Sequence, residues 1–149
     1  MKSEPRTSMQ LSIHQRICYR IVEFETLYCI NENKFCIPSE LNEDQVKYNV
    51  LQGTYIALRY VENDNCINMW HVEVQEDAIR HKLIKKVHIT NKVLKSLPTI
   101  MKKFLNVITE SHRRCYNTRQ EALKHVISML TNLQFSENET KELLKWITQ

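Results

Sequence analysis

The sequence predicts an α+β fold: N-terminal antiparallel hairpins with one helix, followed by a C-terminal helical half. Two observations predict this order. Segments rich in β-branched and aromatic residues, separated by turn sequences, lie before residue 75, and helical spacing of apolar residues dominates after it. The 149 residues suffice for one domain, which we place at residues 11–149 after a disordered lead at residues 1–10. The alternative is an all-α bundle of about six or seven helices, if residues 11–30 and 54–74 are helical.

A first hairpin is predicted near the start of this domain. Eight of the fourteen residues from 17 to 30 are β-branched or aromatic, which favours a strand. Residues 31–34 have the polar composition of a turn, and residues 35–37 are expected to form a short return strand that ends at Pro38. The competing helical face would consist of Ile13, Ile17, Ile21, Phe24 and Tyr28.

A helix and a second hairpin are predicted next. We expect the helix at about residues 40–52, because Ser39 or Asn42 can cap its start and Gly53 follows its end. Strands are expected on either side of a polar turn at residues 62–65, and apolar residues on both faces predict a sheet covered on both sides. The first face would hold Ile56, Leu58 and Tyr60 with Cys66, Trp70, Val72 and Val74, and the second Ala57, Val61, Ile67 and Met69.

The rest of the chain is predicted to be helical. A helix is expected at residues 76–87, since acids lie at its start and the basic pair Lys85 and Lys86 at its end. Its apolar face would be Ile79, Leu83, Ile84 and Val87. A second helical pattern covers residues 92–112, where Pro98 either starts or kinks the helix. Two further helices follow the capping boxes Thr118-x-x-Glu121 and Ser136-x-x-Glu139.

The charges of this chain are strongly sorted along the sequence. Residues 22–79 carry eleven acids and three bases, a net charge of −8, whereas residues 80–125 carry twelve bases and two acids, a net charge of +10. This pattern predicts either mutual attraction of the two parts or a basic face for an acidic partner. In the first case, acids of residues 22–79 would pair with basic residues within the fold or across a homodimer. Those basic residues are Lys85, Lys86, Arg113 and Arg114.

Composition excludes several classes of protein. The single glycine, Gly53, is too few for phosphate-binding loops, dinucleotide-binding turns or a nucleophile elbow. No apolar stretch is long enough to span a membrane, and the polar sequence of residues 1–10 leads us to expect no secretory signal. We therefore expect a cytoplasmic or nuclear location and interpret the five cysteines as reduced, buried thiols. Scarce glycine with frequent asparagine, isoleucine and lysine is typical of an A/T-rich genome, including viral ones.

No metal, cofactor or catalytic site is predicted. A structural zinc site normally has two pairs of ligands, each pair closely spaced in the sequence. The nearest candidates here are three loose pairs, His112 with Cys115, Cys66 with His71, and Cys29 with Cys36, and they do not form that arrangement. Cys115 is the best candidate nucleophile, because the two preceding arginines would stabilise a thiolate; an ordinary thiol on a basic helix end explains it more simply. Glu23 and Glu25 share a strand face without further sign of catalysis. We therefore predict that the protein is not an enzyme.

The basic segment at residues 80–119 is the main candidate for binding. Its density of cations is expected in a protein that contacts phosphates, which makes nucleic-acid binding the alternative function. Only Phe104 and Tyr116 are aromatic in this segment, however, so bases would find few side chains on which to stack. Docking of an acidic protein explains the same charge with fewer requirements.

We therefore predict a non-enzymatic intracellular interaction module, an adaptor or regulatory subunit, that docks an acidic partner protein through a basic helical face. No membrane partner and no cofactor are expected. Trp146, on the last predicted helix, is a candidate interface anchor if its side chain is exposed. The candidate partner-binding residues are Arg80, Lys82, Lys85, Lys86, Lys102, Lys103, Arg113, Arg114, Arg119 and Trp146.

Overall fold

The computed structural model describes residues 18–36, 52–76 and 78–149. These residues form a five-stranded antiparallel sheet and four helices, so the α+β class is confirmed and the all-α alternative is wrong. The strands are β1 (Glu23–Cys29), β2 (Lys34–Cys36), β3 (Gly53–Val61), β4 (Cys66–Gln75) and β5 (Ala78–His88), in the spatial order β2-β1-β3-β4-β5. The lead predicted at residues 1–10 and the helix predicted at residues 40–52 lie outside the described residues.

Two antiparallel hairpins occur where the sequence predicts them. β1 and β2 pair with Tyr28 opposite Phe35, and Asn33 in their turn has a φ of 56°, which asparagine tolerates better than most residues. β3 and β4 pair around the turn at residues 62–65. Gly53 is the first residue of β3, where its φ of +155° favours glycine.

The pairing of faces predicted for the second hairpin is wrong. Leu58 lies opposite Met69 and Tyr60 opposite Ile67, whereas Ala57 lies opposite Trp70. The face of β3 that carries Leu58 and Tyr60 therefore pairs with Met69 and Ile67, which were predicted to lie on the opposite face of the hairpin. Because side chains alternate along a strand, a shift of the register by one residue moves every side chain of one strand to the other face.

The helix predicted at residues 76–87 is wrong, because this segment forms strand β5 and pairs along β4. Met69 lies opposite Lys85 and Trp70 opposite Leu83, so Ile84 is the additional residue of a β-bulge. The bulge shifts the alternation of side chains by one position. Ile79, Leu83, Ile84 and Val87 thereby acquire the spacing of a helical face although they belong to a strand.

The four described helices are α3 (Asn91–Ser96), α4 (Thr99–His112), α5 (Arg119–Thr131) and α6 (Glu137–Ile147). Pro98 directly precedes α4, so it starts that helix rather than kinking it. The Thr118 hydroxyl accepts the N–H of Glu121 at 3.1 Å, while the Glu121 carboxylate accepts the N–H of Asn117. Ser136 and Glu139 form the complete predicted capping box at the start of α6.

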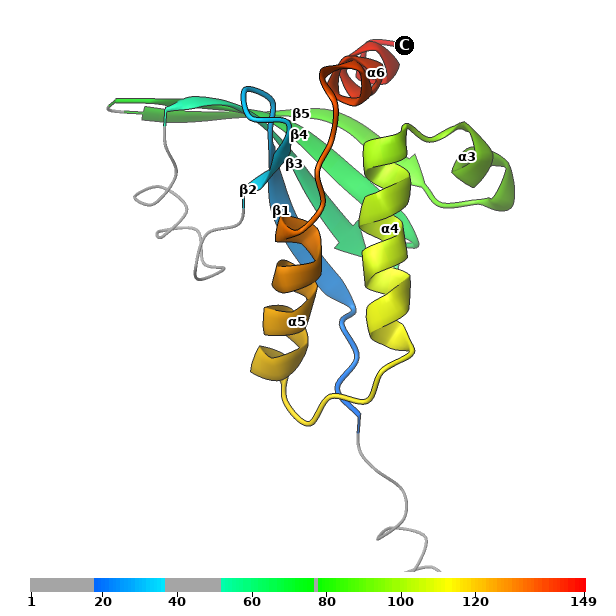
Figure 1. The fold of residues 1–149 in the computed structure, drawn as a ribbon. Helices are drawn as coiled ribbons and strands as arrows, with labels where there is room; N and C mark the ends of the chain where they lie inside the picture. The colour runs from blue at the N-terminus through cyan, green and yellow to red at the C-terminus, as the bar shows by residue number, and fades with distance from the viewer. Residues whose placement is uncertain (1–17, 37–51, 77) are drawn as a thin grey trace, which may run out of the picture.

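Apolar side chains are buried on both faces of the sheet. The larger cluster lies between the sheet and the helices, with α4 and α5 beside each other in Figure 1. Its centre includes Phe104 of α4, whose ring lies 6.3 Å from that of Phe24 and 6.2 Å from that of Phe35. The smaller cluster, on the opposite face, consists of Leu27, Cys29, Tyr55, Ala57, Val72 and Val74. No described helix has both the length and the apolar character needed to cross a membrane.

A buried hydrogen-bond chain fastens α6 to the turn of the first hairpin. The Tyr28 hydroxyl lies 2.6 Å from Oγ1 of Thr140, and Thr140 donates to Oδ1 of Asn33 at 2.6 Å. The Tyr28 ring also meets Phe35 and Phe135 edge to face. These contacts satisfy polar groups that would otherwise be costly to bury, and they fix α6 relative to the sheet.

Candidate functional site

The densest group of predicted binding residues lies on β5, an edge strand of the sheet. In eleven residues β5 carries Arg80, Lys82, Lys85 and Lys86, together with two histidines and no acid. Within the described part of the chain, β5 pairs only with β4, so the backbone groups on its outer side have no strand partner. Figure 1 shows β5 as the long strand at the edge of the sheet. The basic face predicted to be helical is thus partly an edge strand.

The bulge distributes the β5 side chains over both faces of the sheet. Arg80 and Lys82, opposite Glu73 and His71, share one face, and Leu83, opposite Trp70, lies on the other face. Arg80, Lys82 and Lys86 are exposed, and Leu83 is 57% exposed, the largest exposure of a bulky apolar residue in the described chain. This edge therefore offers cations on both sides of its backbone and an apolar side chain in their midst.

Lys85 has an internal role instead. Its ammonium donates to the backbone carbonyls of Trp146 and Gln149 at 3.3 and 3.2 Å and lies 4.3 Å from the centre of the Trp146 ring. Such contacts suit a cation at a helix C-terminus and over an aromatic face. Trp146 is half-buried and packs against the larger core. It therefore meets a side chain of its own fold, and its role as an interface anchor stays a prediction without support from its exposure.

The other predicted binding residues lie apart from β5. Lys102 and Lys103 are on α4, Arg113 and Arg114 follow that helix, and Arg119 begins α5. The ammonium of Lys103 lies 5.5 Å from the centre of the Phe135 ring, and Arg113 pairs with Glu110 at 3.6 Å within its own turn. The structure thus distributes the predicted basic face over a strand, two helices and the connection between those helices.

Mutual neutralisation of the two charged parts is not what the described residues show. Arg59 pairs with Glu23 on the neighbouring strand, and Lys34 pairs with Glu32 in the hairpin turn. Among residues 18–36, 52–76 and 78–149, none of the four cations expected to meet these acids forms an ion pair with one of them. Within the described residues these four cations therefore do not meet those acids, and pairing across a homodimer stays a prediction. Of the β5 cations, Arg80, Lys82 and Lys86 are exposed, whereas Lys85 contacts α6.

Glu62 is the centre of a polar cluster beside the N-terminal segment. Arg20 donates from Nε to its carboxylate at 3.0 Å, and Tyr60 donates at 3.5 Å. His112 Nε2 lies 2.8 Å from the carbonyl oxygen of Ile21 and 3.9 Å from the Glu62 carboxylate. The hydrogen bonds from Arg20 lower the pKa of Glu62 below the usual 4.5, with the nearby charges adding to this effect.

We expect this cluster to make the unfolding free energy depend on pH in the acidic range. Because the folded-state pKa of Glu62 is depressed, its contribution is complete above about pH 4.5, the unfolded value, and is lost as pH falls through the folded value. Glu62→Gln should flatten the fall of the unfolding free energy in that range, as urea titrations at several pH values would measure. Arg20→Gln should flatten it to a similar extent without adding to Glu62→Gln. If the unfolding free energy of Glu62→Gln falls with pH as steeply as that of the wild type, Glu62 is not the source of this pH dependence.

The cysteines divide into two groups that the sequence did not separate. Cys18 and Cys115 form a disulfide, so the prediction of reduced thiols is wrong for them, and Cys115 is no nucleophile in this state. Cys29 and Cys66 are free and buried, as predicted, and Cys36 is free and half-buried. Disulfides persist in oxidising compartments and are rare in the cytosol. The bond therefore lends no support to the predicted cytoplasmic or nuclear location.

Two of the free thiols lie together with a carboxylate. Sγ of Cys29, Sγ of Cys36 and a carboxylate oxygen of Glu32 are all within 4.8 Å of one another. Burial raises the pKa of Cys36 to about 12, and the charge of Cys29 and a hydrogen bond with it act in the same direction. Burial also raises the pKa of the neighbouring Tyr55 to about 12, with the two cysteines contributing. The sequence showed Cys29 and Cys36 on either side of a turn but not the convergence of their side chains with Glu32.

No protein-family model, curated protein or solved structure matches this chain.

Proposed function

We propose that this protein is a non-enzymatic binding module that takes up an extended acidic segment of a partner protein along β5. The observation that supports this most is an edge strand of eleven residues with four permanent cations and no acid. An added strand would gain backbone hydrogen bonds from the outer edge of β5, and its side chains would face those of β5 on both sides of the sheet. Acidic side chains on one face of the added strand would meet Arg80 and Lys82, and apolar side chains on its other face would cover Leu83.

The positive charge of β5 also disfavours pairing between two copies of this strand, which supports a partner of opposite charge. Lysines on an edge strand discourage pairing between copies of one chain, because two such strands repel each other. The same cations attract an acidic strand and speed its association. The edge thus discriminates by charge, which disfavours a homodimer through β5 and favours an acidic partner.

A protein partner fits this edge better than nucleic acid. Leu83 is exposed in the middle of β5, and an apolar side chain of a partner would cover it, whereas phosphates would not. β5 contains no aromatic residue on which bases could stack. Nucleic-acid binding through the basic segment is therefore the second candidate and serves as an outcome of the test.

The test uses a synthetic peptide of about ten residues that alternates glutamate and valine, a length that matches a long strand. We expect it to bind in about 150 mM salt, where weakly placed surface charges are largely screened. The double variant Arg80→Glu/Lys82→Glu should lower the affinity at least about tenfold, since like charges would then face each other. Isothermal titration calorimetry measures both affinities.

The matched control reverses two other exposed cations, away from β5, in Arg113→Glu/Arg114→Glu, and should leave peptide affinity unchanged. A second control is the same peptide with alternate backbone amides methylated, which cannot pair along an edge and should not bind. Equal binding of the methylated peptide would overturn strand addition. Tighter binding of single-stranded DNA than of the peptide, with a steep salt dependence, would instead establish the nucleic-acid function.

A further inference from the structure

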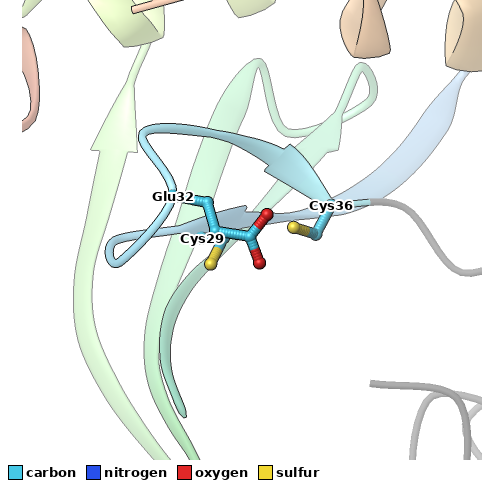
Figure 2. A group of neighbouring side chains, drawn as sticks. All are labelled: Cys29, Glu32 and Cys36. Carbon is cyan, nitrogen blue, oxygen red and sulfur yellow. The ribbon is translucent and has the colours of Figure 1, made fainter. Parts of the chain in front are cut away.

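The β1–β2 hairpin holds two thiols on one face of the sheet. Cys29 is opposite Lys34, and Cys36 is opposite Leu27, so the cysteines are diagonal neighbours across the two strands. Side chains two residues apart on a strand share a face, and diagonal neighbours can reach each other. Figure 2 shows the Glu32 carboxylate, from the turn of the hairpin, in the space between the two cysteine side chains.

We propose that Cys29, Glu32 and Cys36 form a zinc-binding site. Their ligand atoms lie within 4.8 Å of one another, and ligands about 2.0–2.3 Å from a tetrahedral zinc ion would lie roughly 3.5–4 Å apart. Each separation must therefore contract by about 1.3 Å at most, and the exposed Glu32 side chain can supply much of that movement. Three protein ligands leave one position for water.

The kinds of ligand favour zinc over other common ions. Thiolates are poor ligands for magnesium and calcium, which prefer oxygen, whereas a carboxylate is a poor ligand for copper(I). Zinc accepts both. Two thiolates and one carboxylate would leave the zinc complex with a net charge of about −1. Lys34, whose ammonium lies 3.2 Å from Glu32, is placed to balance it.

The surroundings of the thiols also suit a metal centre. Cys29 is buried in the smaller apolar cluster, where the side chains around it limit access of water. Tyr55, on β3 opposite Cys29, is buried beside the thiols and adds a polar group to their environment. β1 and β3 hold this part of the hairpin in a paired sheet, so two of the three ligands come from fixed backbone positions.

The experiment titrates the metal-free full chain, after a thiol assay has counted the free cysteines, with Cd²⁺ as a spectroscopic substitute for zinc. We expect one equivalent to produce thiolate-to-metal charge-transfer absorption in the ultraviolet, and Zn²⁺ to displace it. Cys36→Ser should abolish the absorption, and Glu32→Gln should weaken binding about tenfold or more. Cys66→Ser removes the third free thiol, which lies outside the proposed site, and should leave the charge-transfer absorption unchanged.

A second measurement, the thermal midpoint, distinguishes a loss of metal binding from misfolding of a variant. Glu32 is exposed, so Glu32→Gln should fold normally and keep the thermal midpoint of the metal-free protein. Zn²⁺ should raise the midpoint of the wild type and of Cys66→Ser more than that of Glu32→Gln, because an ion that binds only the folded state stabilises it. Absence of charge-transfer absorption in the wild type, its retention in Cys36→Ser or its loss in Cys66→Ser would overturn the proposal. A Cys29–Cys36 disulfide in the isolated protein would overturn it as well.

Discussion

Reduction of the Cys18–Cys115 disulfide should lower the unfolding free energy by about 2–4 kcal/mol, because the bond closes a long loop and restricts the unfolded chain. The two cysteines are 97 residues apart in the sequence, and the chain-entropy account gives about 4.7 kcal/mol for a loop of about 100 residues, slightly above that typical range. For a chain of this length the thermal midpoint should fall by about 5–15 °C. Thermal unfolding with and without a phosphine reductant measures this change.

The disulfide is one of several contacts that hold the N-terminal segment against the end of α4. Tyr19 donates its N–H to the carbonyl of Tyr116 at 2.8 Å, and the His112 ring bonds to the carbonyl of Ile21. These contacts remain after reduction, so we expect the reduced chain to stay folded with a lower stability. The sheet edge at β5 is built from other residues, so the affinity for the acidic peptide should not depend on the redox state.

The double variant Cys18→Ser/Cys115→Ser should reproduce the reduced wild type and should be insensitive to the reductant. Cys66→Ser, which leaves the disulfide intact, should respond to the reductant as the wild type does. The slope of unfolding free energy against denaturant should also increase on reduction, since an unlinked chain exposes more surface when unfolded. A thermal midpoint that moves by less than about 2 °C would contradict a stabilising disulfide.

The turns and caps of this fold could be predicted from sequence because their signals are local. The polar turn after β1 and the capping box at Ser136 depend on residues within a few positions of one another. β5 could not be predicted in this way. Its bulge at Ile84 arises from pairing with β4, and the resulting phase shift gives a strand the apolar spacing of a helix. Lys85 and Lys86 near the end of this segment also favour a helix, because cations suit a helix C-terminus.

The candidate sites could be predicted only in part, for a similar reason. The sequence indicates that residues 80–86 are basic, but whether they line a helix or a sheet edge depends on long-range pairing, and this decides how a partner can bind. The separation of 97 residues hides the Cys18–Cys115 bond. The spacing Cys29-x-x-Glu32-x-x-x-Cys36 resembles no standard zinc pattern, and only the diagonal pairing of β1 and β2 brings the three side chains together.

Replacement of Phe104 by alanine should be the most damaging single substitution that we predict, with a loss of about 3–5 kcal/mol. Phe104 is fully buried on α4 and touches the rings of Phe24 on β1 and Phe35 on β2. Removing its ring leaves a cavity where the helix layer meets the sheet, and the paired strands limit how far the site can collapse. Urea unfolding followed by circular dichroism measures the loss.

Phe104→Leu keeps most of the apolar volume and should cost much less than Phe104→Ala, in the range of about 1 kcal/mol. Asn106→Ala, at an exposed position of the same helix, should change the unfolding free energy by less than about 0.5 kcal/mol. A loss below about 1 kcal/mol in Phe104→Ala would show that α4 is not held by this aromatic contact. Phe104 contacts β1 and β2, which lie at the opposite end of the strand order from β5. Phe104→Leu should therefore retain wild-type affinity for the acidic peptide. Stability and peptide binding are thus separable in this fold, and a parallel loss of both in Phe104→Leu would mean that binding depends on the whole sheet rather than on its β5 edge.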